Sequence, residues 1–512
     1  MPSAAPAADA PWRLDLPDEG ATTDLARQLA ALAKPGDLIA LSGDLGAGKT
    51  FLARAILRLL TGDPELQAPS PTFTLLQTYD GPGYPILHAD FFRLKSAGEL
   101  DNLGWDEACE GALTLLEWPE RAGAALGADR LEVALALDPA RGASARKAEI
   151  RGRGSLAGRL ARAMATGTLL KRAGWQSAKR DFMQGDASVR AYERLTDADG
   201  GTAILMVAPP RPDGPILRYG KPYAAIAKLS HDIRAFIAVA EGLRRQGYST
   251  PRILAYDVAN GLALLEDFGA QTIAPGDAPA PERYREATAL LADLHKRDLP
   301  AKLPLEGEAY ELPVYDQEAM IVEVELLLDW YAPHVARVHL ASGARMNFLG
   351  LWREILAPVL QKAKTWTLRD YHSPNLHWLE GREGLRRLGL IDFQDAVLGP
   401  PAYDLASLLQ DARVDVPDAL ELRLLGAYVH RRRQSDANFD VAGFGQAYAV
   451  VGAQRATKLL GIFTRLDKRD GKPAYLEHLP RAARTLNKNL AHPALASVRQ
   501  WLQTHLPRLL EA

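Results

Sequence analysis

The chain has 512 residues, of which 47% are hydrophobic and 24% are charged. This is the composition of an ordinary globular protein, and it excludes a wholly disordered, collagen-like or disulfide-stapled chain. The 61 basic and 63 acidic residues leave a formal charge of -2, so the overall charge does not draw the protein to nucleic acid or to a membrane.

At roughly 150 residues per domain, the length predicts more than one domain. The single cysteine, Cys109, cannot form an internal disulfide bond and suits a reducing compartment. The N-terminal sequence MPSAAPAADAP lacks the basic and apolar regions of a signal peptide, and no stretch approaches the ~18 consecutive apolar residues of a membrane span. We therefore expect a cytoplasmic protein with no membrane partner, whose Ala- and Pro-rich residues 1–20 form a disordered tail.

The first domain is expected over residues 21–165, where helical and strand patterns alternate as they do in α/β proteins. A helix is predicted over 23–33 and a strand over 37–41. The apolar spacing that follows predicts a second helix ending at Gly62. Further strands are predicted over 74–79, 86–90, 113–117 and 131–137.

A phosphate-binding loop lies between that first strand and the second helix. Its sequence, GDLGAGKT, fits the pattern G-x-x-x-x-G-K-[ST], which requires this strand–loop–helix context. The glycines allow backbone N–H groups to face phosphates, the lysine reaches the β/γ oxygens, and the last hydroxyl can bind Mg²⁺. The ATP-binding residues predicted here are Gly43, Asp44, Leu45, Gly46, Ala47, Gly48, Lys49 and Thr50.

Two carboxylates follow predicted strands of the same domain. Asp90 ends the segment PILHAD, and Glu117 ends the apolar run LTLLE. The carboxyl ends of parallel strands meet at one edge of a sheet, so both side chains are expected near Thr50. A P-loop ATPase also needs a carboxylate for its metal and a group that positions water. Thr50, Asp90 and Glu117 are therefore the predicted metal-site residues, and Lys49 and Glu117 the predicted catalytic residues.

These motifs together resemble the TsaE family, small P-loop ATPases of bacterial tRNA threonylcarbamoyladenosine synthesis. The resemblance covers about residues 20–165 and rests on GDLGAGKT, SPTFTLLQTY, HADFFRL, ELDNLGWDE and LLEWPER. It implies a switch-like segment over 70–74, with Thr72 near the γ-phosphate, and places Trp118 beside the nucleotide. It also implies two protein partners, the threonylcarbamoyl transferase and its paralogue, with tRNA contacted at most indirectly.

A basic stretch follows over residues 141–180, where Glu149 is the only acidic residue. One interpretation is a solvated strand and helix that lead into a linker over 166–180, which is the usual meaning of a charged run. The alternative is a patch that binds RNA phosphates or an acidic partner. The basic residues are Arg141, Arg146, Lys147, Arg151, Arg153, Arg159, Arg162, Lys171, Arg172, Lys179 and Arg180.

The second domain is expected over residues 181–512, beginning with an α+β pattern and continuing as helices from Pro281. Strands are predicted over 192–196 and 202–207, a helix over 226–246, and paired strands over 253–256 and 261–266. Within the helical part, LRDYHSPNLHW is followed by LIDFQD. Kinase-like folds use such a carboxylate, an amide five positions later and a second carboxylate. We predict Asp370 as the catalytic base and Asn375 and Asp392 as Mg²⁺ ligands.

This part of the chain resembles the aminoglycoside phosphotransferase-like kinases over about residues 175–500. The fold class implied for the whole chain is therefore an α/β P-loop NTPase domain followed by a two-lobed α+β protein-kinase-like domain. RDYHSPN, IDFQDAVLGPPAYDLASLL and GDASVRAYERL match the family's catalytic, metal and glycine-loop segments. The last segment implies ATP contacts from Gly185, Ser188 and Arg190. Within this family, the chain most resembles the sugar kinases that phosphorylate the anomeric hydroxyl of N-acetylmuramate and N-acetylglucosamine. This narrower resemblance rests on the glycine-loop segment, on LLEDFG and on QRATKLLGIFTRL.

One residue departs from the pattern of these kinases. Met206 stands where most of them carry a lysine for the α/β phosphates. A pseudokinase is one explanation, but the predicted base and both metal ligands are present, which favours phosphoryl transfer. Arg190 or Lys228 could supply the missing charge. Gln394, Asp395 and Arg345 are the predicted sugar-binding residues.

The sequence therefore predicts a bifunctional protein that uses ATP and Mg²⁺ in both halves. The N-terminal half would be the ATPase of the tRNA modification machinery, and the C-terminal half a kinase for a small sugar. Two alternatives remain open for the functions. The first half could be a nucleotide-gated adaptor, and the second could phosphorylate an aminoglycoside or an amino alcohol, or be a pseudokinase.

Overall fold

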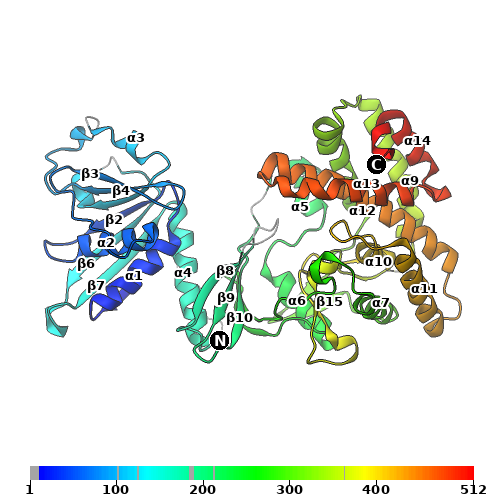
Figure 1. Cartoon of the computed structure of the whole chain (residues 1–512), viewed down its shortest axis with the longest axis horizontal. Helices are drawn as coiled ribbons and strands as arrows, with labels where there is room; N and C mark the ends of the chain where they lie inside the picture. Colours follow the sequence, from blue (N-terminus) through cyan, green and yellow to red (C-terminus); the bar gives the residue numbers. More distant parts are fainter. Residues whose placement is uncertain are drawn as a thin grey trace. The chain divides into compact units, whose positions relative to one another are not determined.

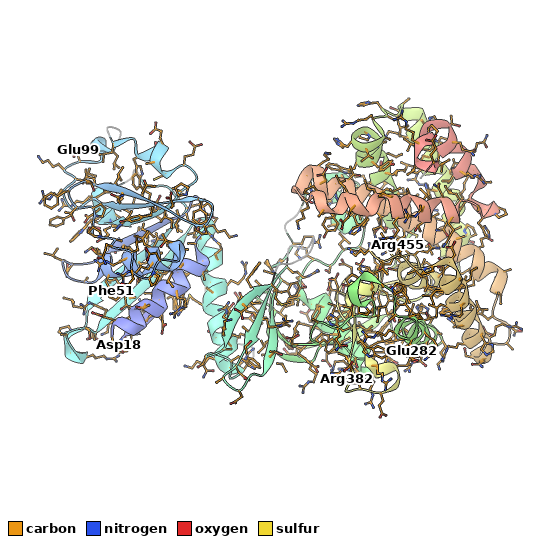
Figure 2. All side chains as sticks on the ribbon, viewed as in Figure 1. Asp18, Phe51, Glu99, Glu282, Arg382 and Arg455 are labelled. Carbon is orange, nitrogen blue, oxygen red and sulfur yellow. The ribbon has the colours of Figure 1, made fainter. Side chains whose placement is uncertain are left out.

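The computed structural model describes residues 11–100, 103–123, 126–183, 190–211, 214–362 and 364–511. The chain divides into two compact units, Met1–Gln176 and Ser177–Ala512 (Figure 1). Side chains fill the space between the sheets and helices of each unit (Figure 2). Among the described residues, none of the helices combines the length and the apolar character needed to cross a membrane.

The first unit is an α/β domain built on one seven-stranded sheet with the order β1-β7-β6-β2-β5-β4-β3. Strands β4, β2, β5 and β6 run parallel to one another, and the three outer strands run antiparallel to their neighbours. The strands are β1 (Trp12–Leu16), β2 (Leu38–Ser42), β3 (Leu76–Asp80), β4 (Pro85–Asp90), β5 (Leu113–Glu117), β6 (Arg130–Leu137) and β7 (Arg146–Arg153). The helices are α1 (Glu19–Leu32), α2 (Lys49–Thr61), α3 (Trp105–Cys109) and α4 (Ser155–Arg172).

The parallel strands bring their carboxyl ends to the edge of the sheet where α2 begins. Asp90 at the end of β4 is the register partner of Glu117 at the end of β5, and Glu117 is in turn paired with Leu41 of β2. All five residues of β5 are buried, because helices or loops cover both faces of a parallel sheet. Helix α2 ends at Gly62, which adopts the left-handed conformation that closes a helix, as predicted.

Two predicted irregular segments are regular structure instead. Trp12–Leu16 form β1, whose alternate residues Trp12, Leu14 and Leu16 pack on the core of the unit, so the predicted tail is wrong for this part. Residues 1–10 lie outside the described residues. The predicted linker over 166–180 is also partly wrong, because α4 continues to Arg172 and β8 begins at Lys179. Buried apolar residues of α4 sustain the helix beyond the point where its basic composition suggested a linker.

The second unit begins with a five-stranded antiparallel sheet in the order β13-β14-β10-β9-β8. Its strands are β8 (Lys179–Met183), β9 (Ala191–Thr196), β10 (Thr202–Val207), β13 (Ile253–Asp257) and β14 (Leu262–Glu266), with a small hairpin of β11 (Ile216–Arg218) and β12 (Lys221–Pro222). The single helix predicted over 226–246 is two helices, α5 (Tyr223–Ile226) and α6 (Ile233–Arg245). Asp232 separates them, because its side chain accepts a hydrogen bond from the Arg234 N–H and starts α6.

The rest of the unit is mainly helical, as predicted from Pro281 onward. Its helices are α7 (Pro281–His295), α8 (Gln317–Leu326), α9 (Ser342–Leu360), α10 (Ala402–Leu409), α11 (Asp418–Ser435), α12 (Val441–Asp470), α13 (Leu479–Asn489) and α14 (Ala496–His505). Short strands form three antiparallel two-stranded sheets, β15 (Lys302–Leu305) with β16 (Glu308–Glu311), β17 (Thr365–Thr367) with β20 (Val397–Gly399), and β18 (Leu376–Trp378) with β19 (Leu388–Leu390). The long helix α12 contacts α8, α10 and α13 (Figure 1).

Helix α12 packs closely against the chain at the end of α8. A Cβ atom added at Gly461 would lie 2.4 Å from the carbonyl carbon of Leu326, which is backbone and cannot turn aside. Gly445, on the same helix, has no atom within 4 Å of the added position. We expect Gly461→Ala to lower the free energy of unfolding of this unit by about 1–3 kcal/mol through overpacking.

The matched variant Gly445→Ala should leave stability unchanged or raise it by up to ~1 kcal/mol, because alanine favours a helix. Urea unfolding followed by tryptophan fluorescence measures both. Equal stability of the two variants would contradict the close packing of α12 on α8.

Candidate active sites

The phosphate-binding loop connects β2 to α2 in a conformation that requires glycine. Gly43 has a φ of 135°, and a Cβ atom there would lie 2.2 Å from the Leu135 carbonyl oxygen. Gly48 precedes α2 in the left-handed conformation. The loop thereby reaches the N-terminus of α2, where free backbone N–H groups and the helix dipole favour phosphate.

Lys49 is nearly buried beside the loop. Its Nζ donates hydrogen bonds to the carbonyl oxygens of Gly43, at 2.6 Å, and Asp44, at 2.9 Å. The same ammonium lies 3.7 Å from the centroid of the Trp118 ring, a cation–π contact. Burial lowers the pKa of Lys49, although Glu117 and other nearby acids oppose this shift. The ammonium is thus held by loop oxygens and an indole face at the end of the sheet.

Glu117 links the loop helix to the neighbouring strand. Its carboxylate accepts a hydrogen bond from the Thr50 hydroxyl at 2.8 Å and lies 3.0 Å from Nε2 of His88. Both His88 and Glu117 are buried, so their contact fixes the carboxylate toward Thr50. No role for His88 was predicted from the sequence. Its position two residues before Asp90 on one strand, and hence on the same face, was the available signal.

Asp90 holds the segment predicted to act as a switch. One of its carboxylate oxygens accepts hydrogen bonds from the hydroxyls of Ser70 and Thr72, the latter at 2.7 Å. Its other oxygen accepts a hydrogen bond from the Phe92 N–H at 2.8 Å. Asp90 and Thr72 therefore lie together at the same sheet edge as Glu117, as the sequence predicts.

The basic stretch makes contacts inside the first unit. Arg146 donates hydrogen bonds from Nε to the carbonyl oxygen of Ala47, at 3.0 Å, and so holds the phosphate loop. Arg159 binds Asp37 and the carbonyl oxygen of Leu32. Other ion pairs join Arg141 to Asp15, Lys147 to Asp138, Arg151 to Glu149 and Arg153 to Glu132. These contacts favour a strand and helix with paired charges over a patch devoted to RNA.

The second unit contains a cavity of about 550 Å³ between its sheet and its helices. Its lining includes the sequence-predicted residues Asp370, Asn375, Asp392, Gln394, Asp395 and Arg190. Arg345 does not line this cavity, because it forms ion pairs with Asp329 and Glu325. That placement does not support the predicted sugar contact. Gly185 and Ser188 lie outside the described residues.

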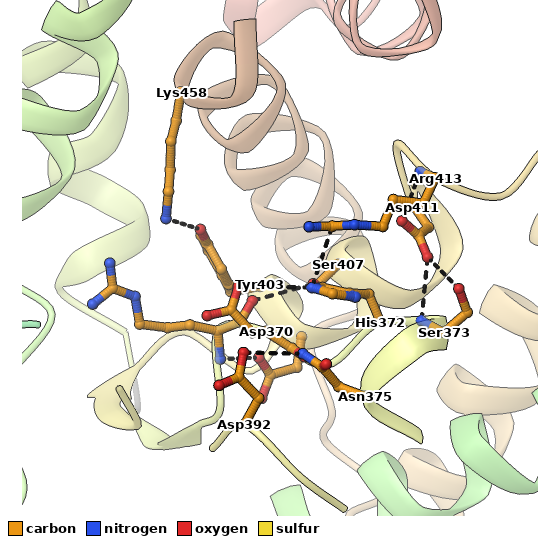
Figure 3. Close-up of polar contacts among 12 residues, drawn as sticks. Asp370, His372, Ser373, Asn375, Asp392, Tyr403, Ser407, Asp411, Arg413 and Lys458 are labelled. Atoms are coloured by element: carbon orange, nitrogen blue, oxygen red, sulfur yellow. Dashed lines mark hydrogen bonds and ion pairs between the residues drawn. The ribbon is translucent and has the colours of Figure 1, made fainter. Parts of the chain in front are cut away.

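The predicted base and metal ligands share one corner of the cavity (Figure 3). The Asn375 amide donates hydrogen bonds to the Asp370 carbonyl oxygen at 2.9 Å and to Asp392 Oδ2 at 3.4 Å. Gln394 donates a hydrogen bond to Asp392 Oδ1 at 2.7 Å. Burial, together with the negative charge of Asp370, raises the pKa of Asp392 to about 6. A cation between these groups would relieve that repulsion.

The donor atoms in both units suit Mg²⁺. Among the described residues, no group of three or more His, Cys, Asp and Glu side chains is gathered as metal ligands are. Mg²⁺ needs no such cage, since it keeps several waters and binds one or two carboxylates together with substrate phosphates. Asp392 with the Asn375 amide oxygen, and the Thr50 hydroxyl with the carboxylates beyond it, are oxygen donors of this kind.

A buried charge network supports the residue before the base. Glu323 of α8 lies 2.5 Å from Arg369 Nη2 and 2.9 Å from Lys458 Nζ of α12. Burial opposes ionisation, but Lys458 and Arg369 outweigh it and hold the pKa of Glu323 below its usual value. The N–H groups of Leu368 and Arg369 also bond the buried carboxylate of Asp404. The backbone leading to Asp370 is therefore fixed from two sides.

Of the two cations predicted to supply the charge missing at Met206, Arg190 lines the cavity and Lys228 does not. Met206 is fully buried in the core, and Ile204, on the same face of β10, lines the cavity. Lys228 is bound to Asp316 at 2.9 Å. Arg190 lines the cavity, with Nη1 lying 3.7 Å from Asp392 Oδ1. Its guanidinium also donates a hydrogen bond to the Ser230 hydroxyl at 3.0 Å, so it lies beside the predicted metal ligand with a contact of its own.

In comparisons with known proteins, the two units match different families. Residues 16–147 match the model of the family described as threonylcarbamoyl adenosine biosynthesis protein TsaE. Residues 182–437 match the model of the phosphotransferase enzyme family.

Individual relatives cover the same two parts. A TsaE protein of Rickettsia bellii is 47% identical over 105 residues, which are 20% of this chain and 72% of that protein. An N-acetylmuramate/N-acetylglucosamine kinase of Caulobacter vibrioides is 36% identical over 358 residues, which are 68% of this chain and 97% of that protein. A kinase of the same name from Pseudomonas aeruginosa is 32% identical over 338 residues, or 64% of this chain and 88% of that protein.

The chain belongs to both families. It is a fusion of a TsaE-family domain with a phosphotransferase-family domain, which is the fold class and the family resemblance predicted from the sequence. The phosphotransferase-family domain is similar over nearly its whole length to the sugar kinases named above. The chain is thus an enzyme of the phosphotransferase class joined to a TsaE-family domain.

The network at Glu323 predicts a large loss of stability when its carboxylate is removed. We expect Glu323→Gln to lower the free energy of unfolding of the phosphotransferase-family domain by about 3–5 kcal/mol, because Arg369 and Lys458 would stay buried without a counter-charge. Glu318→Gln is the matched control on the same helix, since Glu318 makes a partly exposed pair with Arg353.

The control should change stability by less than about 1 kcal/mol. Urea unfolding of the full chain, monitored by tryptophan fluorescence, separates the two variants. A loss at Glu323 no greater than that at Glu318 would show that the buried network does not hold the domain together.

Proposed function

We propose that the phosphotransferase-family domain uses ATP to phosphorylate the anomeric hydroxyl of N-acetylmuramate or N-acetylglucosamine. The observation that carries this proposal is the cavity in which Asp370, Asn375 and Asp392 lie together, in a domain similar to kinases of that name. A base without metal ligands, or metal ligands without a base, would support only the binding of ATP or of the sugar. The three side chains together supply what a kinase-like reaction needs.

In this proposal Asp370 acts as the base. Its carboxylate accepts the proton of the sugar hydroxyl as the hydroxyl oxygen forms a bond to the γ-phosphorus, and the bond from that phosphorus to the leaving ADP oxygen breaks. Asn375 and Asp392 hold Mg²⁺, which when bound neutralises charge on the phosphates. Arg190 takes the place of the usual lysine, since its guanidinium can bind phosphate oxygens as well as an ammonium does. Gln394 and Asp395 orient the sugar at the same corner.

The TsaE-family domain is proposed to hydrolyse ATP for the tRNA threonylcarbamoyladenosine machinery. The phosphate loop from Gly43 to Thr50 binds the triphosphate, and Lys49 turns from its loop carbonyls to the β/γ oxygens. Thr50, Asp90 and Glu117 hold Mg²⁺ and the attacking water, and Trp118 lies beside the nucleotide. Its proposed partners are the threonylcarbamoyl transferase and its paralogue. The buried contact of His88 with Glu117 supports this role, because it orients the carboxylate without exposing it.

Loss of the base tests the kinase proposal. Asp370→Asn keeps the size of the side chain and removes the proton acceptor, so we expect the rate of sugar phosphate formation to fall about 10²–10⁴-fold. ATP binding should be retained, because Asn375 and Asp392 are unchanged. The exposed residue Asp298 provides the control Asp298→Asn, which should keep full activity.

The assay follows sugar phosphate formed from ATP and each amino sugar by the full chain. Product formation that survives in Asp370→Asn would contradict the assignment of the base. A wild type that binds ATP but forms no sugar phosphate would favour another acceptor or a pseudokinase.

Loss of the buried carboxylate tests the ATPase proposal. We expect Glu117→Gln to reduce ATP hydrolysis by the TsaE-family domain about 10²-fold or more, because the group that holds the metal and the water loses its charge. Cells that depend on this chain should then lack the modified nucleoside in their tRNA. Normal modification without ATP turnover would instead favour a nucleotide-gated adaptor.

A further inference from the structure

One wall of the kinase cavity is a single face of α12. Four lining residues, Ile462, Arg465, Leu466 and Arg469, follow the spacing i, i+3, i+4 and i+7. Lys458 lies one turn before them, bound to Glu323, and interacts electrostatically with Asp370. The face therefore starts beside the proposed base. Arg465 is seven residues beyond Lys458, or roughly 10 Å along the helix axis, about the reach of a substituted monosaccharide.

Arg465 has no acidic partner among the described residues. No carboxylate lies within 4.0 Å of its guanidinium, and its Nε is buried without a hydrogen-bond acceptor. Its guanidinium lies over the ring of Tyr223, 4.9 Å from the centroid. By contrast Arg469 is bound to Asp470 by two hydrogen bonds. Arg465 thus brings a positive charge and an unused donor to the cavity.

Arg211 adds a second cation of the same kind. It lines the cavity, its Nε is also buried with no acceptor in the described part of the chain, and its charge is repelled by Arg465 and attracted by Asp395. Asp395 offers limited compensation, because no carboxylate of the described residues, Asp395 included, lies within 4.0 Å of the Arg211 guanidinium. Two guanidinium groups with unused buried donors predict an anionic ligand, since an anion would satisfy both the charge and the hydrogen bonds.

We propose that Arg465, with Arg211, binds a carboxylate on the acceptor, so that this kinase prefers an amino sugar with an acidic substituent over a neutral one. Ile462 and Leu466, one turn apart on the same face, contact the apolar groups of that substituent. The proposal rests on the kinase function above and specifies its substrate. N-acetylmuramate carries a lactyl carboxylate and a methyl group, and N-acetylglucosamine carries neither. The same positive charge disfavours polycationic aminoglycosides as acceptors.

The test compares the two sugars with wild type and Arg465→Gln in the full chain. Losing a charge-assisted hydrogen bond should lower kcat/KM for N-acetylmuramate about 10- to 100-fold. The value for N-acetylglucosamine should change less than about threefold, and the KM for ATP should stay the same. Lys468→Gln is the matched control, since it removes one positive charge from an exposed position three residues along the same helix.

Three results would overturn the proposal. Equal losses for both sugars would mean that Arg465 supports the fold or the chemistry, and a raised KM for ATP would mean that it binds phosphate. No loss for either sugar would mean that no carboxylate is bound there.

Equilibrium binding of both sugars separates this proposal from the kinase function on which it rests. Wild type that binds N-acetylmuramate more tightly than N-acetylglucosamine, with the difference lost in Arg465→Gln, supports the subsite even if neither sugar is phosphorylated. Such binding without phosphorylation of either sugar would overturn the kinase assignment alone. Wild type that binds neither sugar would overturn both.

Discussion

The phosphotransferase-family domain depends on one buried carboxylate, that of Glu323. Two largely buried cations, Arg369 and Lys458, share it, and they come from segments distant in sequence. Arg369 directly precedes the proposed base, and Lys458 begins the face of α12 that forms one wall. A single interaction therefore sets the position of the base relative to the wall that would recognise the acceptor. Removing the Glu323 carboxylate would leave both cations without their partner in the interior, which is far more unfavourable than losing a surface pair.

In the TsaE-family domain, the backbone conformation positions most of the site. Its phosphate loop is shaped by glycines in conformations closed to other residues, and Gly43 has no room for a side chain. Side chains add support, since Arg146 holds the loop at Ala47 and both His88 and Thr50 contact Glu117. One domain thus prepares its site mainly through dihedral angles and sheet register, and the other through buried ion pairs. This difference explains why the loop was recognisable in eight consecutive residues, whereas the kinase site draws on α8, α12 and the catalytic loop.

Features that depend on residues close in sequence were predicted, and features that depend on partners distant in sequence were missed. Local spacing predicts the phosphate loop and the strands over 113–117 and 202–207, and the structure has these elements as expected. The spacing of Asp370, Asn375 and Asp392 likewise indicated a shared site, and all three line one cavity. The strand Trp12–Leu16 was missed because it is stabilised by pairing with β7, more than a hundred residues away. His88 and Glu323 were missed because buried partners distant in sequence make them important. Arg345 was placed in the sugar site from its type and neighbourhood, but Asp329 and Glu325 hold it elsewhere.

We infer that each domain carries a chemical site of its own. Lys49→Ala in the full chain tests it most directly, with ³¹P NMR used to follow sugar 1-phosphate formed from ATP and N-acetylmuramate. We expect this variant to lose the ATP hydrolysis of the TsaE-family domain and to make sugar 1-phosphate at a rate within about twofold of the wild type, since independent sites act additively. Loss of sugar 1-phosphate in Lys49→Ala would contradict the account and show that the two nucleotide sites work as one.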